Sequence, residues 1–102
     1  MTANPIRGEA TFRVAGRDEV LRPTFAALVA AEEELGPLFA LVERAGAGQL
    51  RLAELAALFW HCLTERETLS REQVGEAVVV AGLAGCAPAL RGLLCQILQG
   101  RT

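Results

Sequence analysis

The chain has 102 residues, of which 52% are hydrophobic, and its ten basic and twelve acidic residues give a net charge of −2. This length and composition predict a single globular domain over 1–102 and exclude a disordered chain. The basic residues are dispersed among acids, which argues against a nucleic-acid surface, and no signal peptide or membrane span is expected, so we predict a cytoplasmic protein.

The first predicted element is a β-hairpin over about residues 7–22. Ala10, Phe12 and Val14 alternate with polar residues, as in a strand with one buried face. Gly16 can supply the positive φ of a turn, and a second short strand follows. Because two strands alone are marginal in water, the apolar side of the hairpin must pack on later elements.

Helices are predicted for the rest of the chain. Thr24, after Pro23, is a candidate N-cap for the first helix, and Gly36 is expected to end it. Strands followed by a separate block of helices are typical of the α+β class, here a hairpin and a bundle of about five short helices. The predicted helices span about residues 24–35, 37–45, 52–64, 71–81 and 88–98.

Two of these helices carry further signals. The 52–64 helix is apolar around most of its circumference, so it should be contacted on several sides and lie at the centre. Ser70 and Gln73 have the spacing of a capping box ahead of the 71–81 helix. The run at residues 78–80 is three valines, which also favours a strand.

No set of residues predicts an enzyme, a metal site or a cofactor. His61 and Cys62 are neighbours on a helix, so their side chains point about 100° apart and form no catalytic dyad. We expect His61 at the wet edge of its helix. Glu residues at 32–34 spread around a helix and cannot converge on one cation. With Cys86 and Cys95, the three cysteines lack paired spacing and are expected as free thiols.

Three apolar residues are candidates for contact with a partner. Trp60 is of the type that anchors interfaces, although aromatic residues more often fill the core. Val79 and Val80 cannot both be buried by one helix face. They are expected either to pack between two layers or to lie in an exposed apolar patch.

One acidic residue is expected to need a partner. Drawn at about 100° per residue, the first helix places Glu32 on its apolar face, while Glu33 and Glu34 point to solvent. Arg22 or Arg17 could then pair with Glu32 and hold the hairpin to the helix. The alternative is a rotation of the helix that leaves Glu32 in water.

The stretch Leu21-Arg22-Pro23-Thr24-Phe25-Ala26-Ala27-Leu28, followed by Glu32 and Gly36, resembles the gene transfer agent family of small phage-type tail proteins. Asn4, Arg7-Gly8-Glu9 and the hairpin stretch Val14-Ala15-Gly16-Arg17 match the opening of the same family. The resemblance covers roughly the first third of the chain and thins beyond Gly36. It implies a non-enzymatic protein described either as a tail tube protein or as a tail assembly chaperone.

We favour the chaperone interpretation, because one short hairpin offers too little strand for the wall of a tube. The expected partners are a tape-measure protein or an unassembled tube subunit, met in the cytoplasm or on assembling particles, and self-association is left open. The alternatives are a structural tail component, a small nucleic-acid-binding regulator, for which Arg91, Gln96 and Gln99 are too few, and an enzyme, which ranks lowest.

Overall fold

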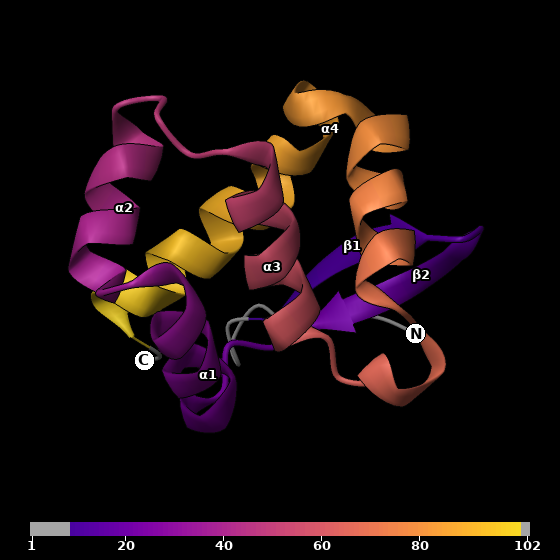
Figure 1. Ribbon diagram of the computed structural model, residues 1–102, viewed down its shortest axis with the longest axis horizontal. Coiled ribbons are helices and arrows are strands. Elements are labelled where there is room, and N and C mark those ends of the chain that lie inside the picture. Colours follow the sequence, from indigo (N-terminus) through magenta and orange to yellow (C-terminus); the bar gives the residue numbers. More distant parts are fainter. Residues whose placement is uncertain (1–8, 101–102) are drawn as a thin grey trace.

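A computed structural model describes residues 9–100. A two-stranded hairpin is followed by helices that pack around a central one (Figure 1), which confirms the α+β class. In chain order the elements are β1 (Ala10–Val14), β2 (Arg17–Leu21), α1 (Phe25–Leu35), α2 (Leu38–Gly46), α3 (Leu52–Cys62), the short 3-10 helix η2 (Arg66–Thr68) and α4 (Arg71–Gln99).

The hairpin forms as its alternation predicts. Phe12 and Val14 are buried on one side of β1, and Val14 pairs with Arg17 across the turn. The turn therefore has two residues, Ala15 at φ 51° and Gly16 at φ 82°, which are the two positive φ values that a type I′ turn needs. The β1 strand begins at Ala10, and residues 7 and 8 of the predicted hairpin lie outside the described part.

Both ends of α1 follow the predicted caps. The Thr24 hydroxyl oxygen accepts a hydrogen bond from the Ala27 N–H at 3.1 Å. Gly36, at φ 91°, ends the helix and donates its N–H to the Glu32 carbonyl oxygen at 2.9 Å. The observed bounds of α1 and α2 agree with the predicted helices to within one residue.

Helix α3 is the centre of the molecule, as its composition predicts. Leu58 and Phe59 are fully buried, and the Phe59 ring meets the Phe12 ring of the hairpin edge-on, with centroids 4.8 Å apart. The helix ends at Cys62 rather than Thr64. The chain turns extended there because Leu63 forms a β-bridge with Leu21 at the outer edge of β2.

The predicted fourth and fifth helices are one bent helix, so the described residues contain four α-helices rather than five. Gly82, with φ 78° and ψ 159°, separates a first limb at 71–81 from a second limb at 83–99. The second limb starts at once because a single glycine in this conformation redirects the chain without a linker. Pro88 is the first residue of the predicted 88–98 helix, and in the structure it lies inside the second limb.

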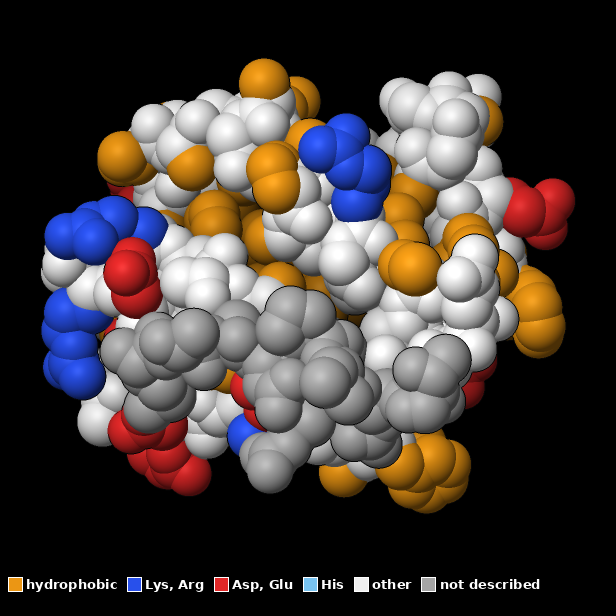
Figure 2. All heavy atoms as spheres, turned by 180° about the vertical axis from the view of Figure 1, so that it is seen from behind, with side chains coloured by type: hydrophobic (Ala, Val, Ile, Leu, Met, Phe, Trp, Pro, Cys, Tyr) orange, Lys and Arg blue, Asp and Glu red, His pale blue; other side chains and the backbone are white. Residues whose placement is uncertain are grey.

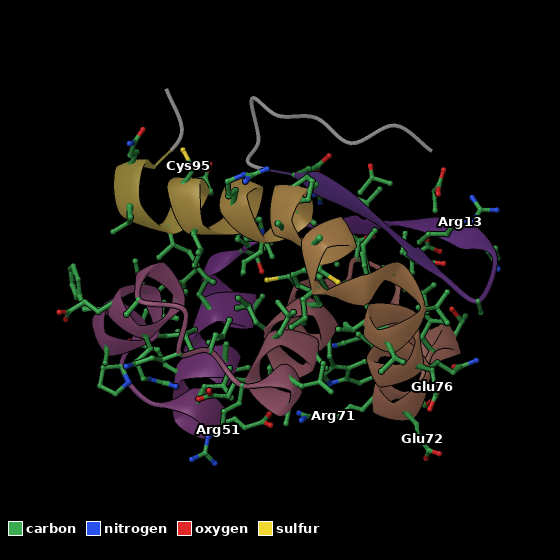
Figure 3. All side chains as sticks on the ribbon, turned by 90° about the horizontal axis from the view of Figure 1, so that it is seen from above. Arg13, Arg51, Arg71, Glu72, Glu76 and Cys95 are labelled. Atoms are coloured by element: carbon green, nitrogen blue, oxygen red, sulfur yellow. The ribbon has the colours of Figure 1, made fainter. Side chains whose placement is uncertain are left out.

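The two limbs of α4 pack on different parts of the core. The first limb buries Val74 and Val78, and the second buries Cys86, Ala89 and Leu93. Figures 1 and 3 show the first limb beside the hairpin, and the second limb on the far side of α3. The bend thus lets one helix cover two sides of the central helix.

By length and composition alone, α4 could cross a membrane. An 18-residue window of α4 has a mean hydropathy of 1.8. In the folded protein, 22% of that window is buried. The expectation of no membrane span from the sequence overlooked that this apolar stretch is long enough for one, because the glycines and alanines around the bend add no charge. A single such helix is weak evidence for a membrane span.

Candidate partner-binding surface

A cleft of about 710 Å³ lies between the hairpin turn and the first limb of α4. Figure 3 shows Arg13 on the hairpin side and Glu72 and Glu76 along the limb. The lining residues are Arg13, Ala15, Gly16, Ser70, Glu72, Gln73, Glu76, Ala77, Val80 and Ala81. We call this hollow the hairpin cleft.

The helix wall of the hairpin cleft follows from helical spacing. Glu72, Glu76 and Val80 are four residues apart and form one row along the limb. The hairpin wall consists of Arg13, Ala15 and Gly16, and the lack of a large side chain at the two turn residues leaves the space open. The resulting cleft has an apolar floor with carboxylates along one side.

Apolar side chains continue from the cleft across the bend of α4. Val79 is 62% exposed, Val80 86% and Leu83 67%. Figure 2, which views the molecule from behind, shows apolar side chains along the upper part of that face. Packing between two layers therefore does not cover Val79 and Val80, whereas Val78, the first valine of the run, is fully buried. Their contact with a partner remains a prediction.

The charges around the hairpin cleft are only partly balanced. Arg13 donates to Asp18 Oδ1 at 3.1 Å and to the Gly16 carbonyl oxygen at 2.7 Å, so it is held by its own hairpin. Glu72 and Glu76 are exposed, and neither forms an ion pair with any residue in the described range 9–100. The cleft therefore carries unneutralised negative charge along its helix wall.

A second polar group, the Glu34 cluster, joins three helices on another part of the surface. Arg71 donates two hydrogen bonds of 2.6 Å to the two Glu34 carboxylate oxygens, and His61 Nε2 lies 2.8 Å from Glu34 Oε1. The hydrogen bonds from Arg71 and then His61 lower the pKa of Glu34 to about 2. Glu34 raises the pKa of Arg71 in turn. The cluster ties the C-terminal end of α1 to the end of α3 and the start of α4.

Two further expectations about this region were wrong or remain open. His61 is buried rather than at a wet edge, because α1 and α4 converge on the end of α3, and its Nδ1 has no hydrogen-bond partner in the described structure. Trp60 is half-buried, and the Arg71 guanidinium lies 5.9 Å from its ring centroid. Trp60 does not line the hairpin cleft, and its contact with a partner remains a prediction.

Of the two alternatives for Glu32, the pairing with Arg22 or Arg17 is wrong, and the rotation of the helix that leaves Glu32 in water is confirmed. The buried positions of α1 are Ala27 and Ala31, so the helix is rotated and Glu34, three residues after Ala31, faces α3. Glu32 is exposed, and its Oε2 accepts a hydrogen bond from the Leu38 N–H at 3.0 Å, at the start of α2.

The two candidate arginines pair elsewhere. Arg22 donates from Nε to Glu9 Oε2 at 2.6 Å, and the Glu9 side chain is 4% exposed. Arg17 lies 4.0 Å from Glu19 Oε2. Both pairs thus lie within the hairpin or at its open end, and neither joins the hairpin to α1.

The residues of the family resemblance have mainly structural places. Leu21 and Pro23 are buried, Leu28 and Arg22 are half-buried, and Phe25 is 85% exposed. Of the described residues of the resemblance, Gly16 and its turn neighbour Ala15 line the hairpin cleft, and Asn4, Arg7 and Gly8 lie outside the described residues. The residues that carry the charge and apolar surface of the cleft lie on α4, where the only signal in the sequence is a pair of glutamates four residues apart ahead of the valine run.

The thiols and acids of the described residues suggest no reactive centre. Residues 9–100 contain no group of three or more His, Cys, Asp or Glu side chains placed to hold a metal ion. Burial raises the pKa of the Cys62 thiol to about 12 and also raises that of Cys86, so neither is a ready nucleophile. Cys95 is exposed, and all three thiols are free.

The comparisons with known proteins give one match. Residues 7–100 match the model of a family described as "Phage tail tube protein, GTA-gp10". No curated protein and no solved structure matches the chain. The match extends far beyond Gly36, so the resemblance is not confined to the first third of the chain. The chain belongs to this gene transfer agent family of phage-type tail proteins.

Proposed function

We propose that this non-enzymatic tail protein is a tail assembly chaperone that binds an apolar segment of a tape-measure protein or of an unassembled tube subunit. The observation that carries the proposal is the exposed apolar surface of α4, formed by Val79, Val80 and Leu83 beside the hairpin cleft. A protein that shields another needs such a surface, and needs no reactive centre. The chaperone would act in the cytoplasm and on assembling particles, without a cofactor.

The second candidate is a subunit of the tail tube, which the description of the family favours. A tube needs a wall of continuous β-sheet built from many copies. The described residues supply one hairpin, and the outer edge of β2 is already bridged by Leu63. This strand content supports the chaperone over the tube subunit.

The proposed function is tested by coexpression with the neighbouring tail genes and copurification of the client. Replacing Val79 and Val80 by serine should abolish copurification at an unchanged melting temperature, because both side chains are largely exposed. The matched control is Phe39→Ser, which removes an apolar side chain that is 81% exposed on α2. Equal copurification by the double variant and the control would contradict the proposal.

The composition of finished particles separates the two candidates. A chaperone leaves its client on assembly, so mass spectrometry of purified particles should detect little of this chain. A tube subunit would instead be present in many copies for each particle.

We also predict weak binding to duplex DNA at physiological salt in a shift assay, because the charge of the chain is slightly acidic and dispersed.

A further inference from the structure

We propose that the hairpin cleft binds an amphipathic helix that carries arginine or lysine one turn away from its apolar residues, with those basic residues paired to Glu72 and Glu76. This inference deepens the proposed function and rests on it, because it names the chemistry of the client segment. The occupant is a helix of another tail protein, and a second copy of this chain is an outcome that the test must exclude.

The size and lining of the cleft suit one face of a helix. A volume of about 710 Å³ lies in the range of natural binding pockets, and a helix that binds in a groove inserts the apolar side chains of one face. Val80, Ala77 and Ala81 give the limb an apolar floor opposite the turn residues Ala15 and Gly16. The floor continues over the exposed Val79 and Leu83, so an apolar stripe can extend beyond the cleft.

Charge complementarity selects a basic helix rather than any apolar one. Glu72 and Glu76 are one turn apart, and like charges at this spacing disfavour a helix unless a cation lies between or beside them. Arg13, the one basic residue of the lining, is engaged by Asp18 and by the Gly16 carbonyl oxygen. A client cation would therefore meet carboxylates that no ion pair with the described residues neutralises.

Two labelled peptides test the inference by fluorescence anisotropy with the full chain. Each is an amphipathic helix of about 15 residues. They share the same leucine face, and one has arginines flanking it where the other has glutamates. The arginine peptide should bind roughly tenfold more tightly, as two attractive rather than repulsive contacts predict. In amide NMR spectra, its shifts should concentrate at the hairpin turn and at residues 72–81.

Charge reversal supplies the matched controls. The double variant Glu72→Lys with Glu76→Lys should invert the preference between the two peptides. The control is Glu33→Lys with Glu43→Lys, which changes the net charge by the same amount on α1 and α2. This control should keep the preference for the arginine peptide. Val80→Ser should weaken the binding of both peptides. The inference is overturned by an equal preference in all variants, by no binding of either peptide at millimolar concentration, or by a dimer in light scattering that Val80→Ser dissociates.

The same variants separate this inference from the proposed function. If Val79→Ser with Val80→Ser abolishes client copurification and the charge reversal at Glu72 and Glu76 does not weaken it, the chaperone function stands and the inference about a basic client helix fails. If client copurification survives the serine substitutions, the proposed function itself fails.

Discussion

Two acidic groups on helices of this protein have opposite surroundings. Glu34 receives two hydrogen bonds from Arg71 and one contact from His61, and it holds the ends of three helices together. Glu72 and Glu76 stand on the wall of an apolar cleft and pair with no described residue. The carboxylate of the first group is neutralised within the fold, and those of the second form no ion pair with the described residues. Acidic residues thus serve stability in one region and are available for recognition in the other.

The largest expected effect is at the pair of Arg22 and Glu9, which, like the Glu34 cluster, is formed within the fold. Arg22→Ala should lower the free energy of unfolding by about 2 kcal/mol, because it removes a charge-assisted hydrogen bond to the Glu9 carboxylate, whose side chain is 4% exposed. Urea titration measures the change. Arg13→Ala removes an arginine whose side chain is 67% exposed, from a pair with an exposed aspartate, and should change the free energy by less than about 0.5 kcal/mol. Similar losses in both variants would contradict the distinction.

The next effect tests the Glu34 cluster. Glu34→Gln should destabilise the protein by about 1 kcal/mol, less than a fully buried pair because the Glu34 side chain is 37% exposed. Glu33→Gln, on the neighbouring exposed position, should have almost no effect on the same urea titration. If the two variants unfold alike, the cluster contributes no net stability.

The pH dependence of the Glu34 cluster has a definite sign. Because its pKa falls from 4.5 to about 2 on folding, the stabilisation is fully present above about pH 4.5 and is lost as the pH falls toward 2. The difference in unfolding free energy between the wild type and Glu34→Gln should therefore be constant from pH 7 to 5 and shrink below that. A difference that persists unchanged at pH 2 would assign the effect to something other than the carboxylate charge.

The smallest expected effect has the opposite sign. Glu76→Lys should stabilise the protein by about 0.3 kcal/mol, because it replaces a repulsion between residues 72 and 76 by an attraction on the same helix face. Thermal unfolding at low salt, repeated at high salt where the gain should disappear, measures it. A gain in stability together with a loss of the arginine-peptide preference would show directly that this acidic residue is kept for binding. A loss of stability would mean that Glu76 has a structural role.

The features that the sequence predicted are those set by residues close together in the chain. The cap at Thr24, the stop at Gly36 and the capping box at Ser70 each depend on bonds within four residues, and each is present. The rotation of α1 and the bend at Gly82 depend on packing against distant elements. Helical spacing alone therefore left the rotation of α1 undecided between its two alternatives, and it divided α4 in two.

The candidate site could be predicted only in part, for a related reason. The valines at 79 and 80 could be identified as too many for one helix face. Their exposure, and the cleft beside them, required knowing that the hairpin turn stands opposite the first limb of α4. The lack of ion pairs at Glu72 and Glu76 is likewise a property of the folded surface, because the sequence holds enough arginines to neutralise both.

The glycine at position 82 also decides how long the apolar helix of this protein is. As a straight rod, the 29 residues of α4 would extend about 43 Å, beyond the 32 Å longest dimension of the molecule. Divided at Gly82, the limbs rise only about 16 and 25 Å, and each is shorter than the ~30 Å hydrocarbon layer of a bilayer. One backbone conformation thus converts a sequence long enough to span lipid into two short helices that share a protein core.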